Sequence, residues 1–147
     1  MRTLAIDLGS RRVGLALSDA GGQIATPYEV VQVNSPEQAA MRVLDVIEHE
    51  GVERIVLGLP LNMDDSLGPA ARQTIEWGRN LAAASGKPVI FVDERLSSFQ
   101  AEQDLIDRKR GGEKITRKGK KQRLDALAAA AFLQAFLDGK LPPLPVS

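Results

Sequence analysis

The chain has 147 residues, of which 44% are hydrophobic and 26% are charged, and this composition predicts one globular domain with a core of its own. The sequence contains no cysteine, which excludes disulfides and thiolate metal sites and fits a reducing compartment. No apolar run approaches the length of a membrane span, and the first residues lead directly into an apolar strand. We therefore expect an untargeted cytoplasmic protein that does not associate with membranes.

Basic and acidic residues balance over the whole chain, with 19 of each, but their distribution is uneven. Residues 108–123 hold nine Lys or Arg and one acid, Glu113, so this segment carries a charge of +8 and the rest of the chain −8. A basic segment on an acidic body is typical of a protein that binds a polyanion, and a solvated loop is the alternative. The glycines at 111, 112 and 119 favour a mobile loop over residues 108–123.

The chain opens with two apolar runs, one ending near Asp7 and one beginning at Val13, on either side of a turn at residues 9–12. This pattern predicts a β-hairpin of two largely buried strands. Asp7 lies where the first strand leaves the sheet. A carboxylate in an apolar strand is costly unless it is bound, so Asp7 is expected to contact a metal ion, a metal-bound phosphate or the N–H groups of the turn.

Residues 27–33 alternate between apolar and polar, which predicts a third strand with one wet face at an edge of the sheet. A helix is expected to follow as far as Gly51, with Ser35 as its N-cap, Pro36 at its first position and Gln38 closing a capping box. Its buried face is predicted to carry Met41, Leu44 and Ile47.

The second half of the chain alternates strands and helices. The apolar run 54–60 predicts a buried parallel strand, and a loop at 61–66 leads into a helix over about residues 67–85. A fifth strand is expected over 87–92, running out into Asp93, Glu94 and Arg95. The remaining expected elements are a helix from Ser97 or Ser98 to about Lys109, a last helix from about Lys121 to Asp138, and an irregular tail over 139–147.

This order predicts an α/β fold with a mixed five-stranded sheet, three antiparallel strands followed by two parallel ones, and helices on both faces. The carboxyl ends of parallel strands lie at one edge of such a sheet, where ligand sites form. Asp7 and Glu94, with Asp93 beside it, lie at that edge. Asp125 heads the stripe of the last helix that is expected to dock on the sheet, together with Ala129, Phe132 and Phe136.

Three carboxylates at one edge suit Mg²⁺ or Mn²⁺, and two such ions about 3.5–4 Å apart can clamp the attacking and leaving oxygens of a phosphodiester. We favour Glu94 over Asp93 as the ligand because its longer side chain reaches back over the strand end; one of the two acids can instead pair with Arg95 or another arginine. Asp7 can also simply cap its turn, and Asp125 can be a helix-start carboxylate favoured by the helix dipole.

Four segments of the chain, in this order, resemble the signature blocks of the YqgF/RuvX family of RuvC-like nucleases with the RNase H fold: AIDLGSRRVGLALSD (5–19), GLPLNM (58–63), DERLSS (93–98) and LDALAA (124–129). The resemblance spans nearly the whole chain. It implies a single RNase H-like domain over residues 1–147 that is a metal-dependent nuclease processing the 5′ end of pre-16S ribosomal RNA, with Asp7, Glu94 and Asp125 as metal ligands and catalytic residues. Many RNase H-fold nucleases also have an acid at the end of the fourth strand, where this chain has Gly58 and Pro60.

The substrate implied is nucleic acid, with RNA favoured and a DNA junction possible, bound by a monomer or homodimer. The residues expected to contact it are Arg11, Arg12, Arg95, Ser97, Ser98, Lys114, Arg117, Lys118, Lys120, Lys121 and Arg123. Three alternatives remain: a Holliday-junction resolvase, a non-catalytic RNA-binding factor, and a nucleotide-binding domain related to the sugar kinases. The last would need a second, similar domain to enclose ATP.

Overall fold

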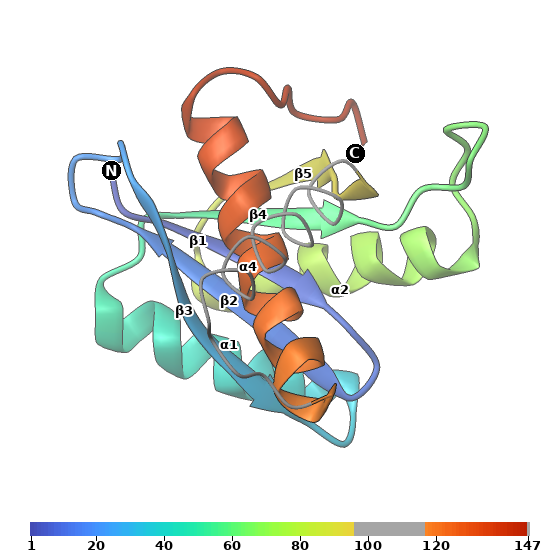
Figure 1. Ribbon diagram of the computed structural model, residues 1–147, viewed down its shortest axis with the longest axis horizontal. Helices are drawn as coiled ribbons and strands as arrows, with labels where there is room; N and C mark the ends of the chain where they lie inside the picture. The colour runs from blue at the N-terminus through green and yellow to red at the C-terminus, as the bar shows by residue number, and fades with distance from the viewer. Residues whose placement is uncertain (96–116, 147) are drawn as a thin grey trace.

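The computed structural model describes the backbone of residues 1–95 and 117–146, and the side chains of residues 1–95 and 125–146 (Figure 1). Its elements in chain order are β1 (Thr3–Leu8), β2 (Arg12–Ser18), β3 (Ala25–Gln32), α1 (Pro36–Glu50), β4 (Arg54–Leu59), α2 (Pro69–Ser85), β5 (Val89–Asp93) and α4 (Arg117–Leu137). The five strands form one sheet in the order β3-β2-β1-β4-β5. The β1–β2 and β2–β3 pairs are antiparallel and the β1–β4 and β4–β5 pairs are parallel, which confirms the predicted topology and the edge position of β3.

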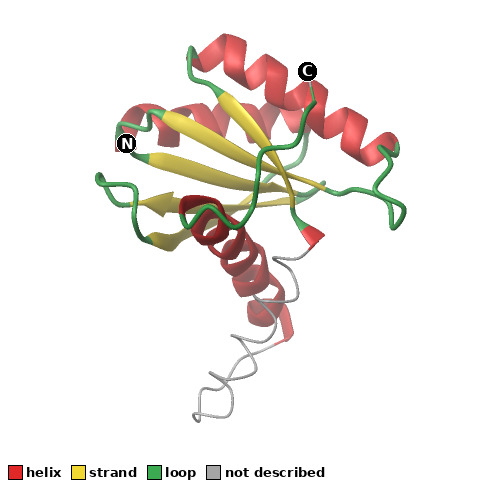
Figure 2. Ribbon diagram, turned by 90° about the horizontal axis from the view of Figure 1, so that it is seen from above, coloured by secondary structure: helices red, strands yellow, loops and turns green. Residues whose placement is uncertain are grey.

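Helices cover both faces of the sheet, as predicted: α1 and α2 lie on one face and α4 crosses the other (Figure 2). The alternation of side chains along β1 separates the two layers of core. Leu4 and Ile6 pack in the cluster beneath α1 and α2, whereas Ala5 packs in the cluster beneath α4. Asp7, two residues after Ala5, therefore projects toward the face that α4 covers.

The start of α1 forms largely as predicted. The Ser35 hydroxyl accepts a hydrogen bond from the Gln38 N–H, and Pro36 occupies the first turn. The Gln38 side chain reaches one residue further back than a capping box requires and accepts from the Asn34 N–H at 2.6 Å. At the other end Gly51 adopts a left-handed conformation, with φ 64°, that ends the helix.

The prediction for the buried face of α1 was wrong at Met41, whose side chain is 67% exposed. The residues that face the sheet are Ala39, Val43, Val46 and Ile47. Met41 follows Ala39 by two positions, and two residues turn an α-helix by about 200°, so Met41 lies on the solvent side. Leu44 is half-buried and packs at the margin of the same cluster, and Ile47 is buried as expected.

Two helix starts differ from the predictions. α2 begins at Pro69 rather than about Leu67, because a proline with no N–H fits the first helical position, and Gly68 precedes it as the N-cap. α4 is already helical at Arg117, before the predicted start at about Lys121, so residues 117–120, which we expected in the basic loop, are helical. The helix predicted between residues 97 and 109 and the remainder of the basic segment, 108–116, lie outside the described residues.

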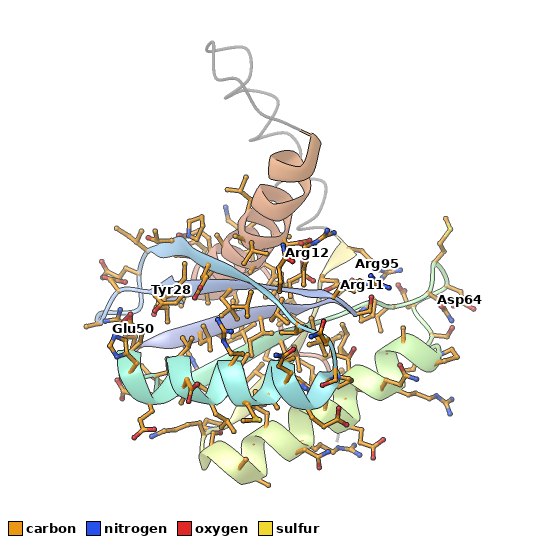
Figure 3. All side chains as sticks on the ribbon, turned by 90° about the horizontal axis from the view of Figure 1, so that it is seen from below. Arg11, Arg12, Tyr28, Glu50, Asp64 and Arg95 are labelled. Atoms are coloured by element: carbon orange, nitrogen blue, oxygen red, sulfur yellow. The ribbon has the colours of Figure 1, made fainter. Side chains whose placement is uncertain are left out.

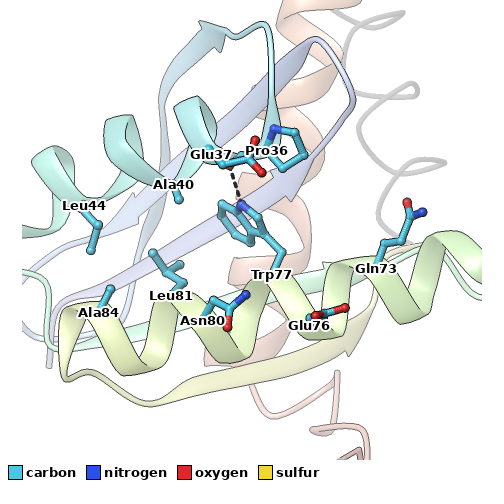
Figure 4. A pocket seen from close by; sticks show the side chains of 10 residues that line it. All are labelled: Pro36, Glu37, Ala40, Leu44, Gln73, Glu76, Trp77, Asn80, Leu81 and Ala84. Atoms are coloured by element: carbon cyan, nitrogen blue, oxygen red, sulfur yellow. Dashed lines mark hydrogen bonds between the residues drawn. The ribbon is translucent and has the colours of Figure 1, made fainter.

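α1 and α2 leave a groove of about 430 Å³ between them, on the face of the sheet opposite α4 (Figure 4). Trp77 of α2 fills its floor and donates a hydrogen bond from its indole N–H to the Pro36 carbonyl at the start of α1, 2.9 Å away. Trp77 is 8% exposed, so its role is helix packing. Because Asp7 projects toward the other face, this groove is not part of the site predicted from the acids.

The C-terminal tail is irregular, as predicted, and runs along the outer edge of β5, where the Leu144 N–H donates to the Phe91 carbonyl at 2.7 Å. Among the described residues no helix is both long and apolar enough to cross a membrane.

Candidate active site

The predicted pair of acids at the carboxyl edge of the sheet is present. Asp7 lies near the end of β1 and Glu94 directly after β5, and both strands run parallel to β4 between them. The side chains of Asp7 and Glu94 form a hydrogen bond with each other. Two residues that are far apart in the sequence therefore make one carboxyl pair.

Gly58 of β4 makes room for this pair. A Cβ placed on Gly58 would lie 2.9 Å from Oε2 of Glu94 and 3.0 Å from the Phe132 ring. The Glu94 carboxyl therefore occupies the space of a side chain on β4. An acid just after the fifth strand thus lies over β4 at the position where Gly58 has no side chain.

Asp125 is brought to the pair by a second glycine. Gly14 of β2 is the register partner of Asp7, and a Cβ at Gly14 would overlap the backbone oxygen of Asp125. The absence of a side chain at Gly14 thus allows α4 to cross β2 directly beside Asp7. The charge of Asp125 acts on both members of the pair, since it raises the pKa of Asp7 and of Glu94.

The Asp125 carboxylate itself is turned toward Arg12. Its Oδ2 accepts a hydrogen bond from Nε of Arg12 at 2.9 Å. Within the described part of the chain, no three His, Cys, Asp or Glu side chains are arranged to hold a metal ion together. The structure therefore brings Asp7 and Glu94 into contact and sets Asp125 beside them, with its carboxylate bound to an arginine.

Burial dominates the electrostatics of the pair. It raises the pKa of Asp7 to about 6 and, reinforced by the charges of Asp7, Asp93 and Asp125, that of Glu94 to about 9. Both carboxyls have raised pKa values and they share a hydrogen bond, so the pair retains a proton near neutral pH. Two half-buried carboxylates in contact cannot both ionise cheaply without a cation, and an all-oxygen donor set of this kind fits a hard divalent ion.

Arg95 distinguishes the surroundings of Asp93 from those of Glu94. The Asp93 carboxylate accepts from Nε of Arg95 at 3.0 Å and from Nη2 at 2.7 Å, and this pairing holds the pKa of Asp93 below its usual value. Asp93 is therefore the structural carboxylate, and Glu94 is the one that joins Asp7.

Arg95 was expected to contact nucleic acid, but in the structure it is engaged with protein groups. It donates to the Asn62 carbonyl at 2.6 Å and forms an ion pair with Asp65, in addition to Asp93. These bonds tie the loop after β4 to the end of β5, at the same edge of the sheet as the acids.

The other residues expected to contact nucleic acid divide into three groups. Arg11 is exposed on the β1–β2 turn, and Arg12 beside it is half-buried against Asp125 (Figure 3). Ser97, Ser98 and Lys114 lie outside the described residues. The last group lies in the first turns of α4, with side chains outside the described set: Arg117, Lys118, Lys120, Lys121 and Arg123.

Sequence reasoning missed two contributors to the site. The Arg12–Asp125 ion pair joins residues 113 positions apart, and no local pattern predicts it. Gly14 and Gly58 could have been found, because a glycine inside a strand signals the close approach of another group.

Comparison with known proteins identifies the family of this chain. Residues 1–139 match the family model described as "RuvX: Holliday junction resolvase". The chain belongs to the RuvX family. It is 40% identical over 144 residues to an Acidiphilium cryptum protein named "Putative pre-16S rRNA nuclease", covering 98% of this chain and 88% of that one. A protein of the same name from Syntrophomonas wolfei is 40% identical over 139 residues, covering 95% of each chain.

Solved structures show the RuvC-like fold of this RuvX family member. Thermus thermophilus RuvC superposes with a TM-score of 0.61 at 21% identity, over 98% of this chain and all of that one. The fowlpox virus resolvase, solved with Holliday-junction DNA, superposes with a TM-score of 0.57 at 12% identity, over 95% of this chain and 98% of the resolvase. At these identities the likeness establishes the fold.

Proposed function

We propose that this protein is a divalent-metal-dependent nuclease that cleaves pre-16S ribosomal RNA during maturation of its 5′ end. The observation that carries the proposal is the half-buried Asp7–Glu94 pair, with Asp125 beside it, at the carboxyl edge of a RuvC-like sheet. The names of relatives 40% identical over nearly the whole chain support the substrate.

In this proposal Asp7 and Glu94 hold Mg²⁺ or Mn²⁺, and Asp125 completes the ligand set. The ions supply electrostatic stabilisation of the charge that develops on the phosphate oxygens during cleavage. The pair carries a proton near neutral pH, and it would give up that proton if a divalent cation were bound between its carboxylates. Arg11 and the basic residues of segment 108–123 are proposed to bind the phosphate backbone.

The test is a cleavage assay on a pre-16S RNA fragment that retains its 5′ extension, with Mg²⁺, Mn²⁺ or EDTA. We expect cleavage by the wild type with either metal and none with EDTA. Asp7→Asn should reduce the rate by at least a hundredfold while keeping the fold, because it removes one carboxylate of the pair. The matched control is Asp45→Asn, an exposed acid on α1, which should cleave at the wild-type rate.

A Holliday-junction resolvase is the second candidate, because the matching family model carries that description. A four-way DNA junction in the same panel separates the two. Paired symmetric cuts in the junction with intact precursor RNA would replace the RNA proposal. RNA binding that is indifferent to EDTA and to Asp7→Asn, without cleavage, would instead identify a non-catalytic RNA-binding factor.

A further inference from the structure

The Arg12–Asp125 ion pair stands at the boundary between the acids and the exposed turn of the hairpin. The backbone of Asp125 has little freedom, because its oxygen packs against Gly14 where a side chain would overlap it. Only the side-chain torsions of Asp125 can therefore change the direction of its carboxylate. In the structure the hydrogen bond from Arg12 sets these torsions. Both side chains are partly open to solvent, with exposed fractions of 33% for Arg12 and 28% for Asp125.

The position of Arg12 has two electrostatic consequences. Its guanidinium neutralises the acid that should complete the ligand set, and its positive charge opposes a cation beside Asp7 and Glu94. A phosphate diester is a good competing partner for an arginine, because the planar guanidinium can form parallel hydrogen bonds to two of its oxygens. Arg12 is the first residue of β2, next to the exposed Arg11, so a bound backbone phosphate can reach it.

We propose that Arg12 is a positioning residue that holds Asp125 away from the Asp7–Glu94 pair until a phosphate of the nucleic acid takes Arg12 as its partner. Binding of the nucleic acid then releases Asp125 and lowers the opposing charge in one step. Substrate and metal bind cooperatively as a result, and each tightens the other by the same factor. This inference rests on the proposed function, because it requires a metal site at the acids.

Calorimetric titration of Mn²⁺ into the full chain, with and without a short 2′-O-methyl RNA as a substrate mimic, tests the inference without measuring cleavage. For the wild type we expect the RNA to tighten Mn²⁺ binding by about tenfold, a coupling of ordinary size. Arg12→Gln should bind Mn²⁺ without RNA about as tightly as the wild type does with RNA, and should gain little more when RNA is added.

Two matched variants separate release of Asp125 from a simple change of charge. Arg11→Gln removes the same charge from the same turn, so it should raise Mn²⁺ affinity less than Arg12→Gln does. Because Arg11 is itself proposed to bind RNA, the RNA is added at a concentration that saturates this variant, and it should then still tighten Mn²⁺ binding. In an Asp125→Asn background, Arg12→Gln should raise Mn²⁺ affinity no more than Arg11→Gln does. Arg12→Lys retains the charge and should retain part of the coupling.

Three results would overturn the inference. If Arg11→Gln and Arg12→Gln changed Mn²⁺ affinity equally, Arg12 would act only through its positive charge and not through its bond to Asp125. Weaker Mn²⁺ binding by Arg12→Gln than by the wild type, with native thermal unfolding, would mean that Arg12 holds Asp125 in its ligating position. A wild type that binds no Mn²⁺ with or without RNA would end the metal-dependent nuclease proposal itself, whereas the first two results leave that proposal standing.

Discussion

At the scale of single residues, the proton held by the Asp7–Glu94 pair is the feature with the widest consequences. Burial raises the pKa of Glu94 from 4.5 to about 9, and that of Asp7 from 3.8 to about 6. The folded chain therefore binds protons at these sites more tightly than the unfolded chain does. Their contribution to stability is complete below pH 4, and it is lost as the pH rises through about 6 and then about 9.

Metal-free protein should accordingly become less stable between pH 5 and pH 9. Glu94→Gln keeps a neutral hydrogen-bonding group beside Asp7 without a proton to lose, so its thermal midpoint should be higher than that of the wild type at pH 9 and should depend less on pH. The measurement is thermal unfolding in EDTA across this range. Glu76→Gln, an exposed residue on α2, is the control for loss of a carboxylate.

The same measurement with added Mn²⁺ gives a second prediction. A divalent ion takes the place of the proton of the pair, so its stabilising effect on the wild type should be larger at pH 9 than at pH 5. Stability that is flat with pH in EDTA, for both proteins, would show that the pair carries no shared proton and would remove the electrostatic argument for the site.

At the scale of secondary-structure elements, the contact between α4 and β2 decides whether the acids meet. Where β1 and β2 pass beneath α4 the sheet carries the small side chains of Ala5 and Ala16, and Gly14 has none at all. α4 therefore packs close against β2, and this close packing places Asp125 beside Asp7. A helix held one side chain higher would carry Asp125 away from the pair.

Gly14→Ala tests this arrangement. The added methyl group would overlap the Asp125 backbone oxygen, so α4 must shift, and overpacking of this kind costs about 1–3 kcal/mol. We expect that loss in the free energy of unfolding from urea denaturation, together with weaker Mn²⁺ binding. Gly21→Ala is the control, because a Cβ there meets only the Asp19 carboxylate at 3.4 Å and the backbone needs no positive φ. Unchanged stability of Gly14→Ala would contradict the close approach of α4.

The elements themselves were largely predictable, because apolar periodicity and capping residues are local signals. The hairpin, the parallel strands and the end of α1 at Gly51 all follow from residues within a few positions of one another. Met41 was misplaced because several faces of α1 carry apolar side chains, and only packing on the sheet selects the buried one. The direction of the Asp125 carboxylate depends on Arg12, 113 residues away. The residues around Asp125 and around Arg12 in the sequence do not indicate that these two side chains pair.

At the scale of the whole molecule, the charge distribution predicts how binding responds to salt. Residues 108–123 carry a charge of +8 in a chain whose net charge is zero. Contacts of such a segment with a phosphate backbone release counterions, so affinity for RNA should fall steeply as salt is added.

Replacing both Lys120 and Lys121 by Gln should lower the slope of log affinity against log salt concentration by about 1–2, at about one phosphate contact for each lysine. Fluorescence anisotropy of a labelled RNA over a salt series measures this slope. Lys140→Gln, an exposed lysine after α4, should leave the slope at its wild-type value. A slope that is unaffected by the double substitution would leave the basic segment as a solvated region with no contact to RNA.

The tail along β5 also bears on whether the sheet can grow by adding strands from other copies. The Leu144 N–H donates a hydrogen bond to the Phe91 carbonyl, so the tail already covers the outer edge of β5 at this residue. At the opposite margin, β3 contains Pro27, which has no N–H to donate, and its register with β2 shifts between Leu15 and Ala16. Addition of strands from other copies at either margin of the sheet is therefore disfavoured.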